Sequence, residues 1–239
     1  MLFANGVPKV LILMVTIFYL APMRKFEDTY RHKGLRKKLI DTIREKGISD
    51  EKVLAAMMNI PRHFFLDTAL QDISYEDRAF PIAEGQTISQ PYTVAYQTQL
   101  LQVEQYDKIL EIGTGSAYQA TVLAEMGAQV FTIERQKNLF EKNKNFVFRS
   151  KYPNIKFFYG DGFEGLPTYS PFDKIIITAA APHIPPKLVE QLKTRGKMVV
   201  PLDEDHHQRM LRVTKNADGS WEEESFENFS FVPMLKGKN

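Results

Sequence analysis

The sequence predicts an α/β domain with a doubly wound, mostly parallel sheet that begins near Asp107. The first observation is an alternation of short apolar segments with helical patterns, which is typical of parallel strands covered by helices on both faces. The second is a glycine-rich turn at residues 113–115, directly after the first of these segments, where a doubly wound sheet binds nucleotides. The third is a break in the alternation after Pro201, where two strand-like segments flank the turn residues 216–219.

The core is expected to contain five parallel strands, three helices and a terminal antiparallel hairpin. The strands are expected at residues 109–112, 130–133, 155–159, 174–178 and 198–200. The helices are expected at residues 118–126, 137 to about 149, and 186–192. Gly127 ends the first helix, and the last is closed near Gly196. The hairpin is expected at residues 210–213 and 221–226.

Helical patterns also dominate the residues before this core. Apolar side chains recur at helical spacing over residues 30–46, and a second helix, capped by Ser49 or Asp50, has to end before Pro61. Residues 62–84 look irregular, and a third helix begins at Pro91. We therefore expect an N-terminal helical and substrate-loop region at residues 23–106 and the core at residues 107–239.

The first 22 residues are treated separately as an apolar extension. Residues 10–21 are almost wholly apolar, but a membrane span needs about 20 such residues. Their length fits the apolar part of a signal peptide, although no A-x-A cleavage site follows. The alternatives are a translation start at Met23, a signal or anchor, or a folded element. Membrane contact is expected only if residues 10–21 are retained as an anchor. Without a genuine signal the expected location is the cytoplasm, and with one it is the periplasm or the membrane.

Composition excludes several kinds of chemistry. The chain has no cysteine, so disulfides, thiolate catalysis and cysteine-bound zinc are excluded. The net charge of +2 gives no reason to expect a nucleic-acid partner. The adjacent pair His206 and His207 lacks the spacing that places two metal ligands on one helical face. We expect no metal, and a monomer.

Acidic residues follow successive predicted strands at the same edge of the sheet. Glu134 ends the second strand about 20 residues after the glycine-rich turn, where such folds place the acid that binds ribose hydroxyls. Asp161 follows the third strand and could accept a hydrogen bond from an adenine amine. Tyr118 stands where a dinucleotide-binding turn wants glycine or alanine, which favours S-adenosylmethionine over NAD.

These residues, together with others, resemble the protein-L-isoaspartate O-methyltransferases. The resemblance runs from about residue 29 to 235 and is most specific at residues 86–91 (Gln-Thr-Ile-Ser-Gln-Pro) and 178–182 (Thr-Ala-Ala-Ala-Pro). It also covers Pro-Arg-His-Phe at 61–64, Glu-Ile-Gly-Thr-Gly-Ser at 111–116 and Phe-Val-Pro at 231–233. One departure is Ala117, where the family usually has a third glycine. An alanine costs about 1 kcal/mol there if φ is positive and nothing if the residue is helical.

The resemblance implies a Rossmann-like methyltransferase fold, S-adenosylmethionine as cofactor, and methylation of the free α-carboxylate of L-isoaspartyl residues in damaged proteins and peptides. The cofactor-binding residues that it implies are Glu111, Gly113, Gly115, Ser116, Glu134, Asp161 and Gly162. Ser89 is implied as the catalytic residue that orients the carboxylate, with capping of the helix at Pro91 as its alternative role. The implied substrate-binding residues are Gln86, Thr87, Ile88 and Gln208. His63 is expected to be structural.

The chemistry itself needs few catalytic groups. A carboxylate with a pKa near 4 is already ionised at neutral pH, so no general base is required. The enzyme has to hold the carboxylate and the methyl group in line and exclude water. Three alternatives remain open: a methyltransferase of the same fold that acts on RNA or a small molecule, a non-catalytic S-adenosylmethionine-binding protein, and an NAD oxidoreductase.

Overall fold

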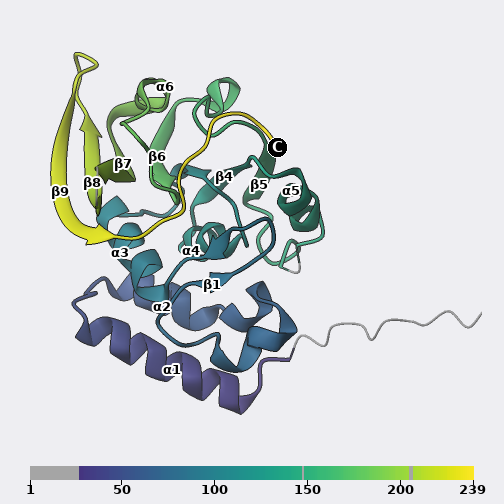
Figure 1. Cartoon of the computed structure of the whole chain (residues 1–239). Helices are drawn as coiled ribbons and strands as arrows, with labels where there is room; N and C mark the ends of the chain where they lie inside the picture. Colours follow the sequence, from purple (N-terminus) through teal and green to yellow (C-terminus); the bar gives the residue numbers. More distant parts are fainter. Residues whose placement is uncertain (1–26, 147, 205–206) are drawn as a thin grey trace, which may run out of the picture.

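The computed structural model describes residues 27–146, 148–204 and 207–239, so the predicted extension at residues 1–22 lies outside the described residues. A seven-stranded sheet in the order β5-β4-β3-β6-β7-β8-β9 forms the centre of the molecule (Figure 1). Its strands are β3 (Lys108–Ile112), β4 (Gln129–Glu134), β5 (Ile155–Tyr159), β6 (Phe172–Ile177), β7 (Leu192–Glu204), β8 (His207–Lys215) and β9 (Trp221–Phe229). The pairs from β5 to β7 are parallel, whereas β7–β8 and β8–β9 are antiparallel. The predicted mostly parallel sheet with an antiparallel end is confirmed.

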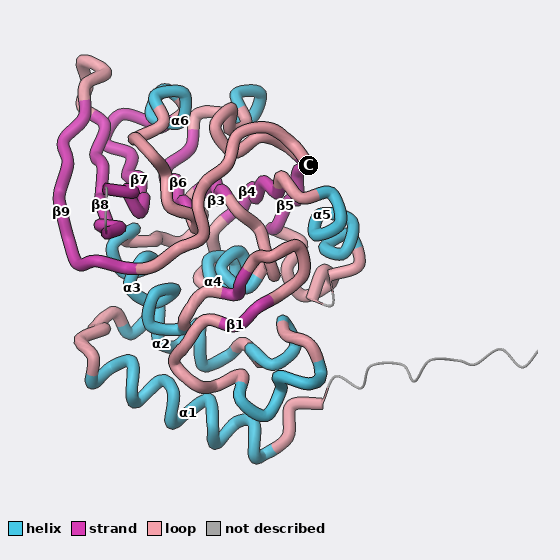
Figure 2. The backbone as a smooth tube through the Cα atoms, in the orientation of Figure 1, coloured by secondary structure: helices cyan, strands magenta, loops and turns pink. Residues whose placement is uncertain are grey.

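Helices cover both faces of this sheet and also form a separate layer below it (Figures 1 and 2). The helices that follow strands of the core are α4 (Tyr118–Glu125), α5 (Lys137–Lys144), η3 (Pro167–Tyr169) and α6 (Pro186–Glu190). The elements that precede the core are α1 (Tyr30–Glu45), α2 (Glu51–Asn59), η1 (Arg62–Phe65), η2 (Thr68–Ile73), β1 (Phe80–Pro81), β2 (Thr87–Ile88) and α3 (Pro91–Leu101). Asp50, rather than Ser49, caps α2 by accepting from Lys52 N and Val53 N.

Alternate residues of each strand pack on opposite faces of the sheet. On β3, Ile109 packs with the buried side chains of α3 and α4, whereas Leu110 and Ile112 pack with those of α6. This alternation is the period-two pattern of a strand buried on both sides. A third apolar cluster joins α1, α2 and η1 to α3 and to the start of α4. The helical N-terminal region is therefore packed directly on the core.

Two predicted boundaries are wrong, each because of a long-range contact. Helix α5 ends at Lys144 rather than near Arg149, because the chain turns there and brings Phe146 and Phe148 against the ring of Phe65. The predicted helix at 186–192 ends at Glu190, and β7 already begins at Leu192, which pairs with Phe172. A register shift beside Arg195, whose φ is +64°, lets β7 continue past the predicted turn near Gly196. Strand β7 therefore pairs with the predicted hairpin to form a three-stranded antiparallel section.

None of the helices in the described part of the chain is both long enough and apolar enough to cross a membrane.

Candidate active site

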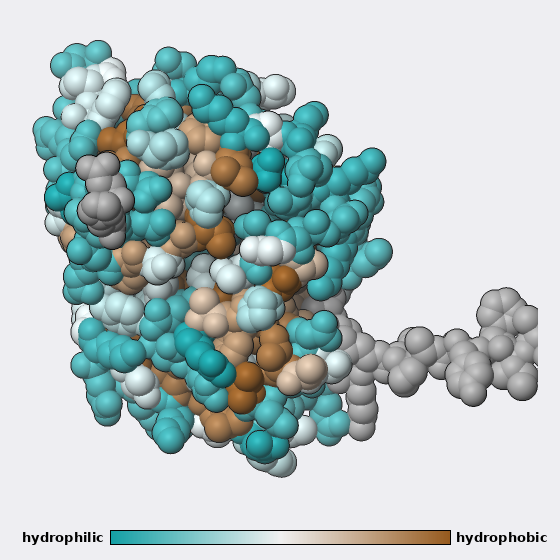
Figure 3. Space-filling view, in the orientation of Figure 1, coloured by the Kyte–Doolittle hydropathy of each residue, from teal (hydrophilic) through white to brown (hydrophobic). Residues whose placement is uncertain are grey.

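A cavity of about 790 Å³, including its open mouth, lies where the carboxyl ends of the central parallel strands meet. Its wall combines the loop after β3, the end of β4, the residues of β2 and the segment that follows β9. Apolar surface is visible beside that last segment and again below β1 (Figure 3). Most of the predicted site residues line this cavity. They are Gln86, Thr87, Ile88, Ser89, Gly113, Gly115, Ser116, Glu134 and Gly162.

The loop after β3 leaves no room for a side chain at Gly113. Gly113 has a φ of +98°, and a Cβ there would lie 2.6 Å from the Thr178 hydroxyl, which donates to the carbonyls of Ile112 and Gly113. Ala117 also has a positive φ, +66°, although it is the residue before α4. The left-handed alternative for Ala117 is therefore correct, and alanine carries a cost of about 1 kcal/mol there.

Glu134 joins this loop to the end of β4. Its side chain lines the cavity but is almost fully buried, with 4 % exposed. One carboxylate oxygen accepts from Gly115 N at 2.9 Å and the other from Gln136 N at 2.8 Å. Both oxygens retain a further lone pair, so Glu134 can still accept hydrogen bonds from a diol in the cavity.

Glu111 lies behind the cavity rather than on its wall. It is fully buried on β3, and burial, with the Glu134 charge as a smaller contribution, raises the pKa of Glu111 to about 8. The Thr132 side chain and the Ala120 backbone act on this pKa from nearby, but neither carboxylate oxygen has a hydrogen bond of normal geometry in the described part of the chain. The direct cofactor contact that the resemblance implied for Glu111 therefore has no geometric support, because its side chain is separated from the cavity.

The segment that follows β9 covers the edge of the sheet at Asp161. It crosses the front of the molecule toward α5 (Figure 1). The Asp161 carboxylate accepts from Phe163 N at 2.9 Å and from Gly237 N at 2.7 Å, while Arg135 donates to the Lys236 and Gly237 carbonyls. Asp161 is thus at the expected strand end, but a backbone amide of this segment is bound to it. The Phe-Val-Pro stretch at 231–233 was the only signal in the sequence for this segment.

Ser89 faces the cavity from the end of the short β2 strand. The N-cap of α3 is Gln90, with no side-chain cap hydrogen bond, and Asp77 accepts from Tyr92 N at 2.8 Å instead. The capping alternative for Ser89 is therefore wrong. Ile88 beside it is 2 % exposed, so the loop is anchored by an apolar side chain.

Gln208 does not line the cavity, in contrast to its predicted role in substrate binding. It lies on β8, where its amide donates to the Phe231 carbonyl and accepts from Phe231 N. These bonds occupy both ends of the amide and hold the chain where it leaves β9. The sequence could not indicate this role because the two residues meet only through the pairing of β8 with β9.

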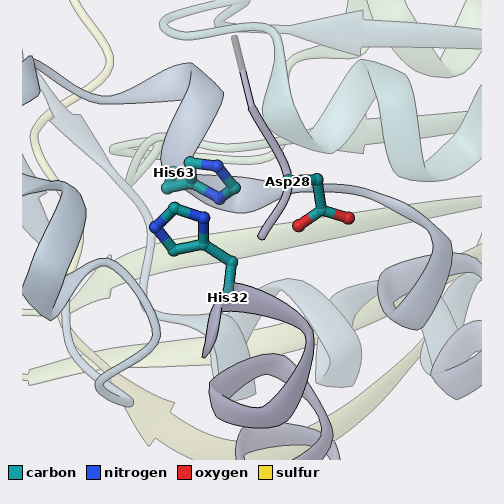
Figure 4. Close-up of side chains that lie close together, drawn as sticks. All are labelled: Asp28, His32 and His63. Carbon is teal, nitrogen blue, oxygen red and sulfur yellow. The ribbon is translucent and has the colours of Figure 1, made fainter. Parts of the chain in front are cut away.

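Asp28, His32 and His63 lie close together (Figure 4), and none of the three lines the cavity. Both Asp28 oxygens accept from the Arg36 guanidinium, whose charge opposes a metal cation there. His63 Nδ1 lies 2.8 Å from the Tyr75 hydroxyl, and its ring stacks on that of His32 with 3.8 Å between centroids. Burial is the main reason that the pKa of His63 falls to about 4. These contacts fit the structural role expected for His63.

Comparison with known proteins places the sequence and the fold in one family. The model of the family "Protein-L-isoaspartate(D-aspartate) O-methyltransferase (PCMT)" matches residues 34–239. A protein-L-isoaspartate O-methyltransferase of Cytophaga hutchinsonii is 53% identical over 209 residues, which are 87% of this chain and 94% of the relative. One of Christiangramia forsetii is 49% identical over 213 residues, which are 89% of this chain and 100% of the relative.

Solved structures agree with these relatives. A protein-L-isoaspartate O-methyltransferase structure superposes with a TM-score of 0.75 at 27% identity and covers 83% of this chain and 65% of that one. A putative Plasmodium falciparum enzyme of the same name, in complex with S-adenosyl-L-homocysteine, superposes with a TM-score of 0.73 at 25% identity. That match covers 84% of this chain and 99% of the other.

Proposed function

This chain belongs to the protein-L-isoaspartate(D-aspartate) O-methyltransferase family, and we propose that it methylates the free α-carboxylate of L-isoaspartyl residues with S-adenosylmethionine. The observation that carries the proposal is one cavity that is lined by the glycine loop and Glu134 and also by the Ser89 loop. A methyl donor and a carboxylate acceptor can therefore meet inside it. The ester that forms then closes spontaneously to a succinimide, whose hydrolysis returns some normal aspartate.

The residues at the sheet edge fit a nucleoside that carries a sulfonium group. A Cβ at Gly113 or Gly162 would lie 2.6 Å from the Thr178 hydroxyl or 2.4 Å from Ile112, so close packing requires glycine at both positions, and both residues line the cavity. Glu134 offers its remaining lone pairs to ribose hydroxyls beside Gly115. When bound, S-adenosylmethionine supplies a methyl group that is already electrophilic.

The acceptor end of the cavity positions a carboxylate and excludes water. The Ser89 hydroxyl donates to one carboxylate oxygen, which leaves the other aimed at the methyl group. Thr87 and Ile88 form the wall beside it. One carboxylate oxygen gains the bond to the methyl carbon as the carbon–sulfur bond breaks, and no proton has to move. The only role of Ser89 in these steps is to donate a hydrogen bond that orients the acceptor carboxylate.

We also propose which molecules the enzyme acts on and where it acts. The acceptors are isoaspartyl segments of proteins and peptides, which reach a site bounded by the substrate-loop region at residues 23–106 and the core at residues 107–239. The enzyme acts as a monomer in the cytoplasm, without a nucleic-acid partner. The net charge of +2 supports the last point.

Paired peptides that differ only in Asp or isoAsp test the activity. With methyl-labelled S-adenosylmethionine, only the isoaspartyl peptide should become labelled. Ser89→Ala should lower kcat/KM by about tenfold to a hundredfold, which corresponds to losing a hydrogen bond to a charged group, and should leave S-adenosylhomocysteine affinity unchanged. Ser220→Ala, in the exposed turn before β9, is the matched control. Equal labelling of both peptides, or full activity in Ser89→Ala, would contradict the proposal.

A further inference from the structure

Arg62 places a buried guanidinium directly behind the Ser89 loop. Its side chain has no exposed surface. Nη2 donates to the Ser89 carbonyl at 2.8 Å, and Nε donates to the Ser74 carbonyl at 3.0 Å. The guanidinium also lies 4.8 Å from the ring centre of Tyr118, which lines the cavity. Arg62 therefore touches two residues of the cavity wall from behind and ties the Ser89 loop to the loop at Ser74.

The positive charge of Arg62 is not neutralised by an ion pair in the described part of the chain. The groups that favour its charged form are the Tyr118 hydroxyl, which acts as a hydrogen-bond partner, and then Asp77, whose carboxylate is already bound to Lys46 Nζ at 2.6 Å. Nη1 of Arg62 has no hydrogen-bond partner among the described residues. Burial lowers the pKa of Arg62 to about 10, so the guanidinium is still charged at neutral pH.

A buried charge without a counter-ion is costly, and proteins usually pair it. The cavity beyond Ser89 is the place where a counter-ion can arrive, because the proposed acceptor is a carboxylate. We propose that Arg62 is a positioning residue that holds the Ser89 loop and makes the acceptor end of the cavity selective for an anionic group. This inference rests on the proposed function and adds the source of its preference for a charged acceptor.

The two contributions of Arg62 affect different kinetic constants. In the reaction a carboxylate and a sulfonium lose their charges together, so a nearby positive charge favours the bound acceptor more than the transition state. The charge should therefore lower KM, whereas the hydrogen bond to the Ser89 carbonyl should support kcat. Arg62→Lys keeps the charge and loses the planar two-carbonyl contact, while Arg62→Met loses both.

The experiment compares two peptides as ligands of the full chain. One carries an isoaspartyl residue, and the other carries the same residue with its α-carboxylate as a carboxamide. The ratio of their inhibition constants measures selectivity for the charge, in the presence of saturating S-adenosylmethionine and a labelled reporter peptide. Arg36→Met is the control, because Arg36 is also a buried arginine but is paired with Asp28 and does not line the cavity, and its charge, like that of Arg62, acts on Tyr118. Thermal unfolding and S-adenosylhomocysteine affinity report on folding and on the cofactor end.

The wild type should prefer the carboxylate, and Arg62→Met should reduce that preference by about tenfold, which is the scale of one charge acting across one layer of side chains. Arg62→Lys and Arg36→Met should keep the preference, and Arg62→Lys should lower kcat. If Arg62→Met does not fold, Asp77→Asn tests whether the charge of Arg62 sets the preference for the carboxylate. Asp77→Asn keeps the acceptor for Tyr92 N and removes the opposing charge, so it should increase the preference; its NH₂ group replaces the oxygen that accepts from Lys46 Nζ and Gln90 Nε2, so thermal unfolding of this variant is measured as well.

Two outcomes overturn the inference. One is an unchanged carboxylate preference in Arg62→Met, and the other is an unchanged or reduced preference in Asp77→Asn. In either case the wild type would still methylate the isoaspartyl peptide, which distinguishes this failure from that of the proposed function. Absence of methylation by the wild type would refute the proposed function itself.

Discussion

Two glutamates on neighbouring strands should respond in opposite ways to the same substitution. Glu134 lines the cavity and accepts from Gly115 N and Gln136 N, whereas Glu111 is buried behind it. In Glu134→Gln only one of the two backbone amides keeps an acceptor, and the new NH₂ group faces the other. In Glu111→Gln an amide of nearly the same shape replaces a carboxyl group whose pKa is about 8 and which is therefore mostly neutral at pH 7.

The magnitudes follow from these contacts. A hydrogen bond to a charged group contributes about 1.5–3 kcal/mol, so Glu134→Gln should weaken S-adenosylhomocysteine binding by about tenfold to 150-fold. Glu111→Gln should change that affinity by less than about threefold. The raised pKa of Glu111 also predicts the pH dependence of stability. The unfolded glutamate ionises near pH 4.5 and the folded one near pH 8, so this residue destabilises the fold increasingly as the pH rises between these values.

Calorimetric titration with S-adenosylhomocysteine tests the first difference, and urea unfolding at pH 5 and pH 8 tests the second. Relative to the wild type, Glu111→Gln should lose less stability between the two pH values. Unchanged affinity in Glu134→Gln would remove Glu134 from the cofactor site. A large loss of affinity in Glu111→Gln, with the fold intact, would mean that Glu111 contacts the cofactor after all.

The strained loop and the buried histidine give two further predictions. Ala117→Gly should change the free energy of unfolding by less than about 1 kcal/mol, because relief of the positive φ is offset by the entropy of glycine and a lost methyl contact, whereas Ala117→Val should cost more than about 2 kcal/mol. Chemical unfolding of both variants checks this, and a tolerated valine would contradict it. The pKa of His63 is about 4 in the fold and near 6.5 when unfolded, so its contribution is intact above pH 6.5 and is lost as the pH falls toward 4. His63→Gln should therefore lose about 1–2 kcal/mol less than the wild type between pH 7 and pH 4.5, and an equal loss in both would show that another group titrates.

Much of the architecture follows from local patterns in the sequence. Strand β3 and helix α4 lie within a residue of their predicted positions, because buried strands and glycine-terminated helices have strong local signals. The alternation of Ile109 and Leu110 between two apolar clusters also follows from period two. The extent of β7 could not be predicted in this way. Its first residues are ordered by pairing with Phe172, which lies 20 residues earlier in the chain.

The residues of the candidate site also fall into two groups, those whose role depends on local sequence and those whose role depends on tertiary contacts. Glycines 113 and 115 and Glu134 could be located, because their roles depend on the turn and strand end that contain them. The surroundings of Asp161, Gln208 and Glu111 could not be predicted, because they come from segments remote in sequence. Asp161 binds Gly237 N, and Gln208 binds the backbone of Phe231. The type of side chain at a strand end predicts which groups it can bind. Which of these groups it contacts in the folded protein is determined by the tertiary structure.

The distribution of charge around the cavity is consistent with a reaction between two ions. The carboxylate of Glu134 lies at the end that fits the nucleoside, and the guanidinium of Arg62 lies behind the Ser89 end. Under the proposed function, this arrangement would draw an acceptor carboxylate toward Arg62 and hold a sulfonium nearer to Glu134, so that the field of the protein orders the two reactants along the cavity. Neither charge has to transfer a proton. The proposed site would therefore act by position and field, and the proposed reaction asks for no general base beside Ser89.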